Sequence, residues 1–225
     1  MRDLQRPGRS PVMAPNGMAA TSHPLSTQVA VDVLKAGGNA MDGAIAACAV
    51  QCVVEPESTG IGGDCFALYS AGGSTDVVAY NGSGRAPAAA TLEKLTELGV
   101  TELERQSAHS VIIPGAVDAW AQLNEDHGKM PLGELLQPAI EYARSGYPIS
   151  QRVWSDFNQM HEHLQSNKNL ADVFLPGGKI PALGSMHKNP GLANALEIIA
   201  KGGRDGFYHG ELANEMVDTL QAEGG

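Results

Sequence analysis

Apolar residues in the first part of the chain recur at the three- and four-residue spacing of helices. Ser22 is the expected N-cap of a first helix, with Pro24 in its first turn, and a pair of glycines ends that helix. Asn39 is the expected cap of a second helix over residues 40–54, where small and apolar side chains run almost all the way round. A helix that is apolar on every side must be surrounded by other elements, so this one is expected at the centre of the fold.

Alternation of apolar and polar residues replaces the helical spacing after the second helix. Residues 65–69 and 76–80 are predicted strands, and the glycine-containing link between them indicates a hairpin. Short strands are also expected over residues 17–21 and 110–115. The remaining helices are expected from Leu92 and over residues 116–127, 132–144 (with a kink at Pro138), 150–165, 191–200 and 209–222. Because composition shifts nowhere, we expect one domain over residues 1–225, with residues 1–15 disordered.

Charge and composition exclude several classes of protein. The formal net charge is -10 and Lys and Arg do not cluster, which argues against a nucleic-acid partner. The longest apolar run, around residues 44–54, is too short to span a membrane. No apolar segment follows the arginines near the N-terminus, so a cytoplasmic location is expected. Cys48, Cys52 and Cys65 are then expected to be free structural thiols, the first two on one buried helical face.

A loop with three glycines, Gly60, Gly62 and Gly63, joins the second helix to the first strand. Glycine reaches φ > 0 and lets another backbone or a ligand approach closely. We therefore expect this structural loop at a crowded junction, as a buried turn or as part of a site. The order helix, glycines, strand excludes a dinucleotide-binding fingerprint, and no Gly-Lys-Ser/Thr follows to form a P-loop.

Arg85 lies in a second glycine-rich loop, directly after the predicted hairpin. A loop arginine is commonly a solvated charge, but the glycines at 82 and 84 leave this one free to bind a carboxylate through two parallel hydrogen bonds. The residues alone leave both interpretations open. No metal site is expected, because His161 and His163 diverge on a helix and neither CxxC nor HExxH occurs.

Several blocks of the sequence, in order from about Met13 to the end, resemble the amino-terminal signature of the gamma-glutamyltransferase family. These blocks are HPL at 23–25, AGGNAMD at 36–42, VEPESTGIGGD at 54–64, RAPAAAT at 85–91, PGAV at 114–117, GKMPL at 128–132, ARSG at 143–146 and GRDGFYHG at 203–210. Many anchored blocks make the resemblance more specific than one glycine motif would be. It implies an N-terminal-nucleophile hydrolase of the α/β (α+β) class with an αββα sandwich, of which this chain is the helix-rich N-terminal portion.

The resemblance also implies a reaction. Family members are precursors that cut themselves into a large and a small subunit, and the new N-terminal Thr attacks a γ-glutamyl amide with its own amine as base. The sequence stops at Gly225, inside the family's large subunit. We therefore expect no catalytic residue in this chain, no cofactor, the small subunit as partner, and glutathione or a related γ-glutamyl amide as substrate.

One departure from the family pattern bears on the substrate. Family members usually carry an arginine in a Phe-Arg-Glu-x-Ala-Pro motif, where it holds the substrate α-carboxylate. Anchoring on Ala86-Pro87 places Ser83 at that position and Arg85 two residues later. Ser83 and Arg85 are therefore the candidate substrate-binding residues. Either Arg85 reaches the same carboxylate from a shifted loop, or the protein is an amidase or β-lactam acylase with another acyl preference. A non-catalytic scaffold or interaction protein is the third alternative.

Overall fold

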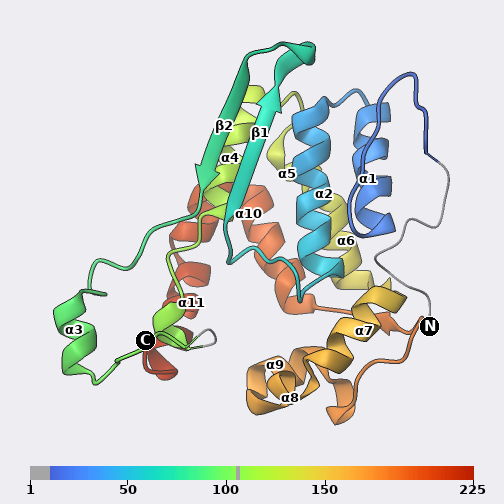
Figure 1. The fold of residues 1–225 in the computed structure, drawn as a ribbon. Coiled ribbons are helices and arrows are strands. Elements are labelled where there is room, and N and C mark those ends of the chain that lie inside the picture. Colours follow the sequence, from blue (N-terminus) through green and yellow to red (C-terminus); the bar gives the residue numbers. More distant parts are fainter. Residues whose placement is uncertain (1–10, 105–106) are drawn as a thin grey trace.

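Helix α2 (Ala40–Val54) is the central element of the computed structural model, which describes residues 11–104 and 107–225 (Figure 1). It packs against α1 (Pro24–Lys35), α4 (Ala116–His127), α5 (Leu132–Leu135) and α6 (Gln137–Ser145). Eleven of its residues are buried, on every side of the helix. Its small side chains allow neighbouring helices to approach closely, so the predicted central position is confirmed.

Asn39 begins α2 with the expected cap. The Asn39 side chain accepts from the backbone N–H of Asp42 at 3.0 Å, and Asp42 accepts in return from the Asn39 backbone at 2.8 Å. These reciprocal bonds satisfy two backbone donors that have no partner within the helix.

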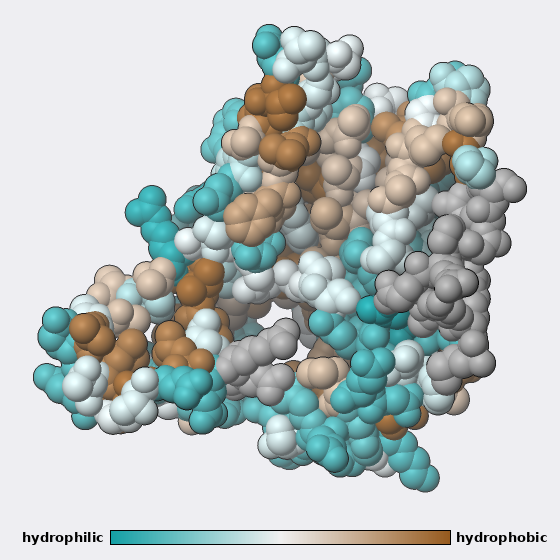
Figure 2. Space-filling model, viewed as in Figure 1, coloured by the Kyte–Doolittle hydropathy of each residue, from teal (hydrophilic) through white to brown (hydrophobic). Residues whose placement is uncertain are grey.

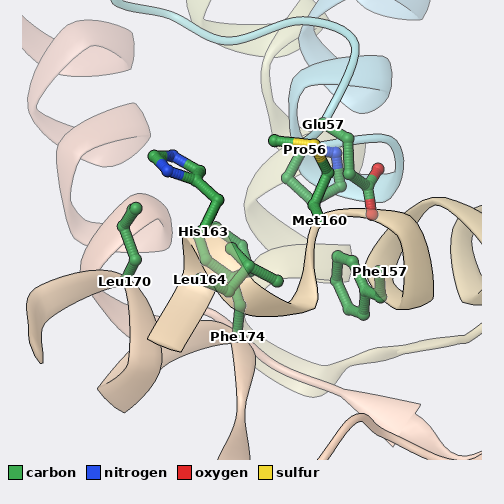
Figure 3. Close-up of a pocket in the computed structure, with 8 residues that line it drawn as sticks. All are labelled: Pro56, Glu57, Phe157, Met160, His163, Leu164, Leu170 and Phe174. Carbon is green, nitrogen blue, oxygen red and sulfur yellow. The ribbon is translucent and has the colours of Figure 1, made fainter. Parts of the chain in front are cut away.

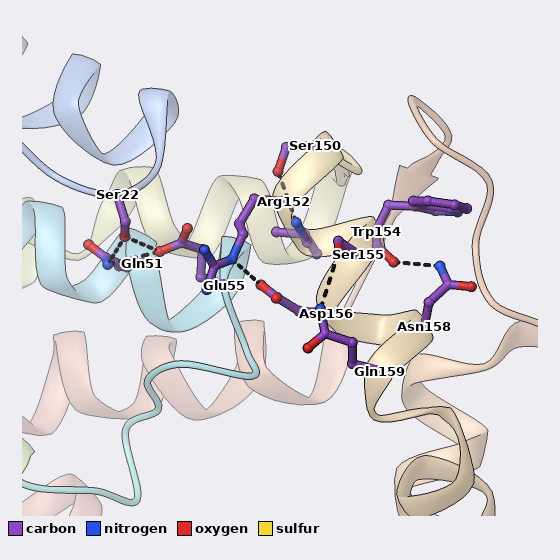
Figure 4. Close-up of polar contacts among 11 residues, drawn as sticks. Ser22, Gln51, Glu55, Ser150, Arg152, Trp154, Ser155, Asp156, Asn158 and Gln159 are labelled. Carbon is purple, nitrogen blue, oxygen red and sulfur yellow. Dashed lines mark hydrogen bonds and ion pairs between the residues drawn. The ribbon is translucent and has the colours of Figure 1, made fainter. Parts of the chain in front are cut away.

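The start of α1 differs from the prediction, because His23 and not Ser22 is the N-cap. The His23 Nδ1 accepts from the backbone N–H of Leu25 at 3.2 Å. The Ser22 hydroxyl instead donates to Glu55 just beyond α2, and Gln51 donates to both of these side chains (Figure 4). Ser22 was mistaken for a cap because the nearby acceptor, Glu55, is distant in the sequence.

The predicted hairpin is confirmed by β1 (Cys65–Ser70) and β2 (Val77–Gly82), which pair antiparallel from Cys65 opposite Gly82 to Ser70 opposite Val77. The turn between them contains the short helix η1 (Ala71–Gly73). One face of the hairpin packs on α4, and side chains alternate between this covered face and solvent along β1. The other face leaves Phe66 and Leu68 64% and 81% exposed, and Figure 2 shows apolar surface over this hairpin.

The second half of the chain is mostly helical, as expected, but two predicted helices are divided, and the helix expected over residues 191–200 is longer in the structure (Pro190–Tyr208), with a non-helical residue at Gly203. The segment 132–144 forms two helices, α5 and α6, since Pro138 at the start of α6 has no N–H to continue the preceding one. The segment 150–165 breaks at Met160 into α7 (Gln151–Gln159) and α8 (His161–Ser166). The further elements are η2 (Ala108–Ser110), α9 (Lys168–Phe174), η3 (Pro176–Gly178), α10 (Pro190–Tyr208), α11 (Glu211–Ala222) and the outlying α3 (Leu92–Glu97).

Strand predictions outside the hairpin were less successful. Residues 17–21 form no strand, and within 110–115 only Ile113 makes a β-bridge, to Arg85. A small pair, β3 (Tyr147–Pro148) and β4 (Met186–His187), was not predicted because two-residue strands leave no periodic signal. Residues 1–10, within the segment expected to be disordered, lie outside the described residues, while residues 11–15 form no helix or strand. Throughout the described part, no helix is both long enough and apolar enough to cross a membrane.

Candidate functional site

Three loops meet at the N-terminus of α4. The carbonyl of Gly63, in the first glycine loop, accepts from the backbone N–H groups of Gly115 and Ala116, both at 3.0 Å. The first N–H groups of a helix have no partner within it, and Gly115 at the N-cap has no side chain to supply one. The Gly60–Gly63 loop is itself closed by a bond from the Gly63 N–H to the Gly60 carbonyl at 3.1 Å. The glycine loop thus caps α4 through its backbone.

The tightest approach in this junction involves a different set of glycines. A Cβ on Gly84, where φ is +78°, would lie 2.1 Å from the carbonyl oxygen of Ile113. A Cβ on Gly115 would lie 2.2 Å from the carbonyl oxygen of Gly82, and one on Gly82 would lie 2.7 Å from the Ala119 side chain. Any larger residue must displace a neighbouring backbone, so glycine is required at these positions.

The steric reason expected for the first glycine loop is wrong for Gly60 and Gly62. Neither has a positive φ, and an added Cβ at either would meet nothing within 4 Å. Gly63 also lacks a positive φ, and its Cβ would meet only the Gly60 carbonyl oxygen, at 3.3 Å. The crowding that the sequence indicated for this loop therefore occurs in the loop after β2 and at the start of α4.

The two candidate substrate-binding residues flank Gly84, so their loop is held against this junction. The Ile113 N–H donates to the Arg85 carbonyl at 2.8 Å, which fixes the backbone of Arg85. Its side chain is exposed, and within residues 11–104 and 107–225 its guanidinium has no ion-pair partner. The Ser83 N–H donates to the Asn81 side chain at 3.1 Å, and Ser83 itself is half-buried. A fixed backbone with an unpaired guanidinium is suited to binding an anion.

The end of α10 contacts this junction at the start of α4. The Tyr208 hydroxyl donates to the Pro114 carbonyl at 2.6 Å and accepts from the backbone N–H of Asp118 at 3.2 Å. Burial raises the pKa of Tyr208, so its hydroxyl stays protonated as a donor. Arg204 pairs with the Asp118 carboxylate and lies 5.0 Å over the Tyr208 ring. Residues 203–210 were noted in the sequence only as a matching block, because nothing local indicated their contact with Pro114.

The cysteines are all free, as predicted, but the prediction that Cys48 and Cys52 share one buried face is wrong. Cys52 is buried, Cys65 is half-buried, and Cys48 is exposed on α2. Burial raises the pKa of Cys52 to about 12, so its thiol is protonated and unreactive near neutral pH. Among the described residues, no group of three or more His, Cys, Asp and Glu side chains is placed to hold a metal ion.

Solved structures define the class of this fold. Over 96% of this chain and 63% of the other, the structure of Helicobacter pylori gamma-glutamyltranspeptidase superposes with a TM-score of 0.89 at 30% identity. Cephalosporin acylase from Bacillus halodurans superposes with a TM-score of 0.85 at 35% identity, over 98% of this chain and 44% of the acylase. The fold is that of the N-terminal-nucleophile hydrolases, of which the described residues form a helix-rich portion.

The sequence itself identifies the family. Residues 26–225 match the family model described as gamma-glutamyltranspeptidase, and the chain belongs to that family. A glutathione hydrolase-like YwrD proenzyme of Bacillus subtilis is 35% identical over 213 residues, which are 95% of this chain and 40% of the relative. The chain spans about two fifths of the length of this and other curated relatives. These relatives are hydrolase and acylase proenzymes.

Proposed function

We propose that this chain is part of a self-processing γ-glutamyl hydrolase or transferase that acts on glutathione or a related γ-glutamyl amide. The observation that carries the proposal is the guanidinium of Arg85, which has no ion-pair partner among the described residues and stands on a backbone held by Ile113 beside the crowded glycines. Two parallel hydrogen bonds from a guanidinium fit the α-carboxylate of a γ-glutamyl group, and Ser83 on the same loop offers a hydroxyl.

The nucleophile of the proposed reaction is an N-terminal threonine from the remainder of the same precursor. The threonine hydroxyl attacks the γ-amide carbon while the free amine of the same residue takes the hydroxyl proton. The tetrahedral intermediate then collapses to the acyl-enzyme as its C–N bond breaks, and the protonated amine of the threonine gives that proton to the departing amine. Water or an acceptor amine then releases the γ-glutamyl group. This chain contributes the residues that hold the carboxylate, and by itself it would be inactive.

The uncovered face of the hairpin supports the remainder of the precursor as the partner. Phe66, Leu68 and Val77 on the two strands are 64%, 81% and 58% exposed. A sheet face with this many exposed large apolar side chains is typical of a surface that another part of a protein covers. We propose that part of the remainder of the precursor packs on this face of the two-stranded sheet.

An amidase or β-lactam acylase is the second candidate. It is favoured by Ser83 at the place of the family's arginine and by the likeness to the cephalosporin acylase. In that case Arg85 would bind a carboxylate elsewhere in the acyl group, or none. The two candidates differ in whether the substrate needs both an α-carboxylate and an α-amine.

A panel of p-nitroanilides assayed with the whole, processed precursor separates these candidates. The proposal predicts that the γ-glutamyl anilide has the highest kcat/KM, that 4-aminobutanoyl anilide, which lacks the carboxylate, is cleaved poorly, and that glutaryl anilide, which lacks the amine, is intermediate. A preference for glutaryl over γ-glutamyl anilide would establish the acylase. Absence of cleavage with every anilide, in a precursor that fails to process, would favour the scaffold.

A further inference from the structure

A cavity of about 200 Å³ lies where the short helices α7, α8 and α9 meet the segment that follows α2 (Figure 3). Its lining is mainly apolar and includes Glu57, Phe157, His163 and Phe174. Several of these side chains are only half-buried, so the cavity is open to solvent. Its volume is below the roughly 300–1,000 Å³ of sites for drug-sized ligands, which limits an occupant to a small molecule.

Glu57 places a carboxylate in this lining. Both of its side-chain oxygens are buried, and neither has a hydrogen-bond partner within the described part of the chain. The pKa of Glu57 is raised from 4.5 to about 7, chiefly by burial and to a lesser extent by the carboxylates of Asp156 and Glu55, while the Glu57 backbone N–H and Arg152 act in the opposite direction. Arg152 donates to Asp156 at 2.8 Å, so its charge is already engaged (Figure 4). Buried carboxylates normally have partners, and this one has a cavity beside it.

Aromatic rings line the same cavity. Phe157 and Phe174 lie with ring centroids 6.0 Å apart, and His187 stands behind them at 6.0 Å from each. Burial lowers the pKa of His187, so this imidazole is neutral at pH 7. The Tyr147 hydroxyl, also buried and without a partner in the described residues, has its pKa raised by burial and by the charge of Glu57. The faces of aromatic rings attract cations, so the rings and the carboxylate favour the same kind of ligand.

We propose that this cavity binds a small organic cation of the alkylammonium class, with its charge at the Glu57 carboxylate and its alkyl part against Phe157 and Phe174. A metal ion fits poorly, because the described residues contain no group of three or more metal-ligating side chains. An ammonium group needs one carboxylate and tolerates apolar walls. His163 is the one imidazole among these lining residues. This inference does not depend on the reaction proposed above.

Calorimetric titration of the purified protein with n-butylammonium chloride tests the proposal, with 1-butanol as the neutral probe of the same shape. At about pH 8 the cation should bind at least about tenfold more tightly than the alcohol, because a charge-assisted bond to a desolvated carboxylate forms only with the ammonium. Affinity for the cation should rise between about pH 5 and about pH 8 as Glu57 ionises, while a primary ammonium keeps its charge over that range.

Two variants and one control separate the contribution of the Glu57 carboxylate from that of the aromatic rings. Glu57→Gln should reduce cation affinity to that of 1-butanol and remove the pH dependence, whereas Glu162→Gln, an exposed glutamate on the neighbouring α8, should change neither. Phe174→Leu should weaken cation binding more than alcohol binding, because only the cation is attracted by the face of the aromatic ring. Carboxyl NMR of Glu57 gives a second readout, because a bound cation must lower its pKa. No cation binding, equal affinity for both probes, or unchanged cation affinity in Glu57→Gln would each overturn the proposal.

Discussion

The backbone N–H of Lys129 donates to both carboxylate oxygens of Asp42, at 3.0 and 3.1 Å, across 87 positions of sequence. The Met130 N–H adds a bond at 3.3 Å and the Asn39 N–H one at 2.8 Å. Asp42 is fully buried and, within the described residues, has no cationic partner. A buried carboxylate is thus satisfied by backbone donors alone, which fastens the start of α2 to the loop after α4.

Asp42→Asn is expected to destabilise the protein by about 2–4 kcal/mol, because an amide NH2 would face backbone donors that need an acceptor. The midpoint of urea unfolding measures the loss. Asp32→Asn on α1 is the matched control, since Asp32 is exposed and pairs with the exposed Lys35, and it should cost less than about 0.5 kcal/mol. An equal loss of stability in both variants would contradict the prediction, because it would show that the hydrogen bonds between Asp42 and Lys129 do not stabilise the fold.

Gly84→Ala is expected to prevent folding or to lower the melting temperature severely. Its Cβ would lie 2.1 Å from the Ile113 carbonyl oxygen at a φ of +78°, and each of these faults costs on the order of 1–3 kcal/mol or more. Gly62→Val is the contrasting variant, since nothing lies within 4 Å of a Cβ there. Thermal unfolding of the two should differ widely. A larger loss in Gly62→Val would mean that a segment beyond the described residues packs on the first glycine loop.

Arg85→Ala in the whole, processed precursor is expected to raise KM for the γ-glutamyl anilide at least about tenfold, with folding and processing unchanged. Arg85→Lys should restore only part of the loss, because an ammonium cannot form two parallel hydrogen bonds to a carboxylate. Lys94→Ala, which removes another exposed cation from the nearby α3, should leave KM within about twofold. If KM of Arg85→Ala also stays within about twofold, Arg85 is a solvated charge that does not bind substrate, and the acylase alternative is favoured.

Thiol titration should count three cysteines in the denatured, unreduced protein. In the native protein Cys52 should not react near neutral pH, because burial raises its pKa to about 12 and removes the nucleophilic thiolate. Cys52→Ser assigns the signal: the denatured count should fall to two while the native reaction stays the same. A denatured count of one in the unsubstituted protein would reveal a disulfide.

Glu57 should make stability depend on pH in a defined direction. Its pKa is about 7 in the folded protein and 4.5 without the surroundings of the fold, so the folded state binds more protons between these values. The contribution of the protonated group is complete below about pH 4.5 and is lost as pH rises through about 7. The melting temperature of Glu57→Gln relative to the unsubstituted protein should therefore increase between about pH 5 and about pH 8. Glu162→Gln should give a difference that is flat with pH, and a flat difference for Glu57→Gln would refute the raised pKa.

Local patterns in the sequence were sufficient for the main elements. The apolar run from Ala40 to Val54 determines a central helix, since its composition leaves no face for water, and Asn39 with Asp42 defines its start. Strand alternation around residues 65–80 determined the hairpin in the same way. The kink at Pro138 followed from the missing N–H of proline, a property of one residue.

The sequence did not reveal which residues, distant along the chain, come into contact in the fold. It marked Gly60 and Gly62 as crowded, yet the close approaches are at Gly84 and Gly115, because crowding depends on which backbones the fold brings together. It identified Ser22 as a cap, but the fold placed Glu55 within reach of that hydroxyl. The sequence by itself determined the family resemblance, the helices and the hairpin, which depend on residues close together along the chain. Only the tertiary structure decided which glycines are indispensable and where the Glu57 carboxylate is buried, because contacts between distant segments form only when the whole chain packs.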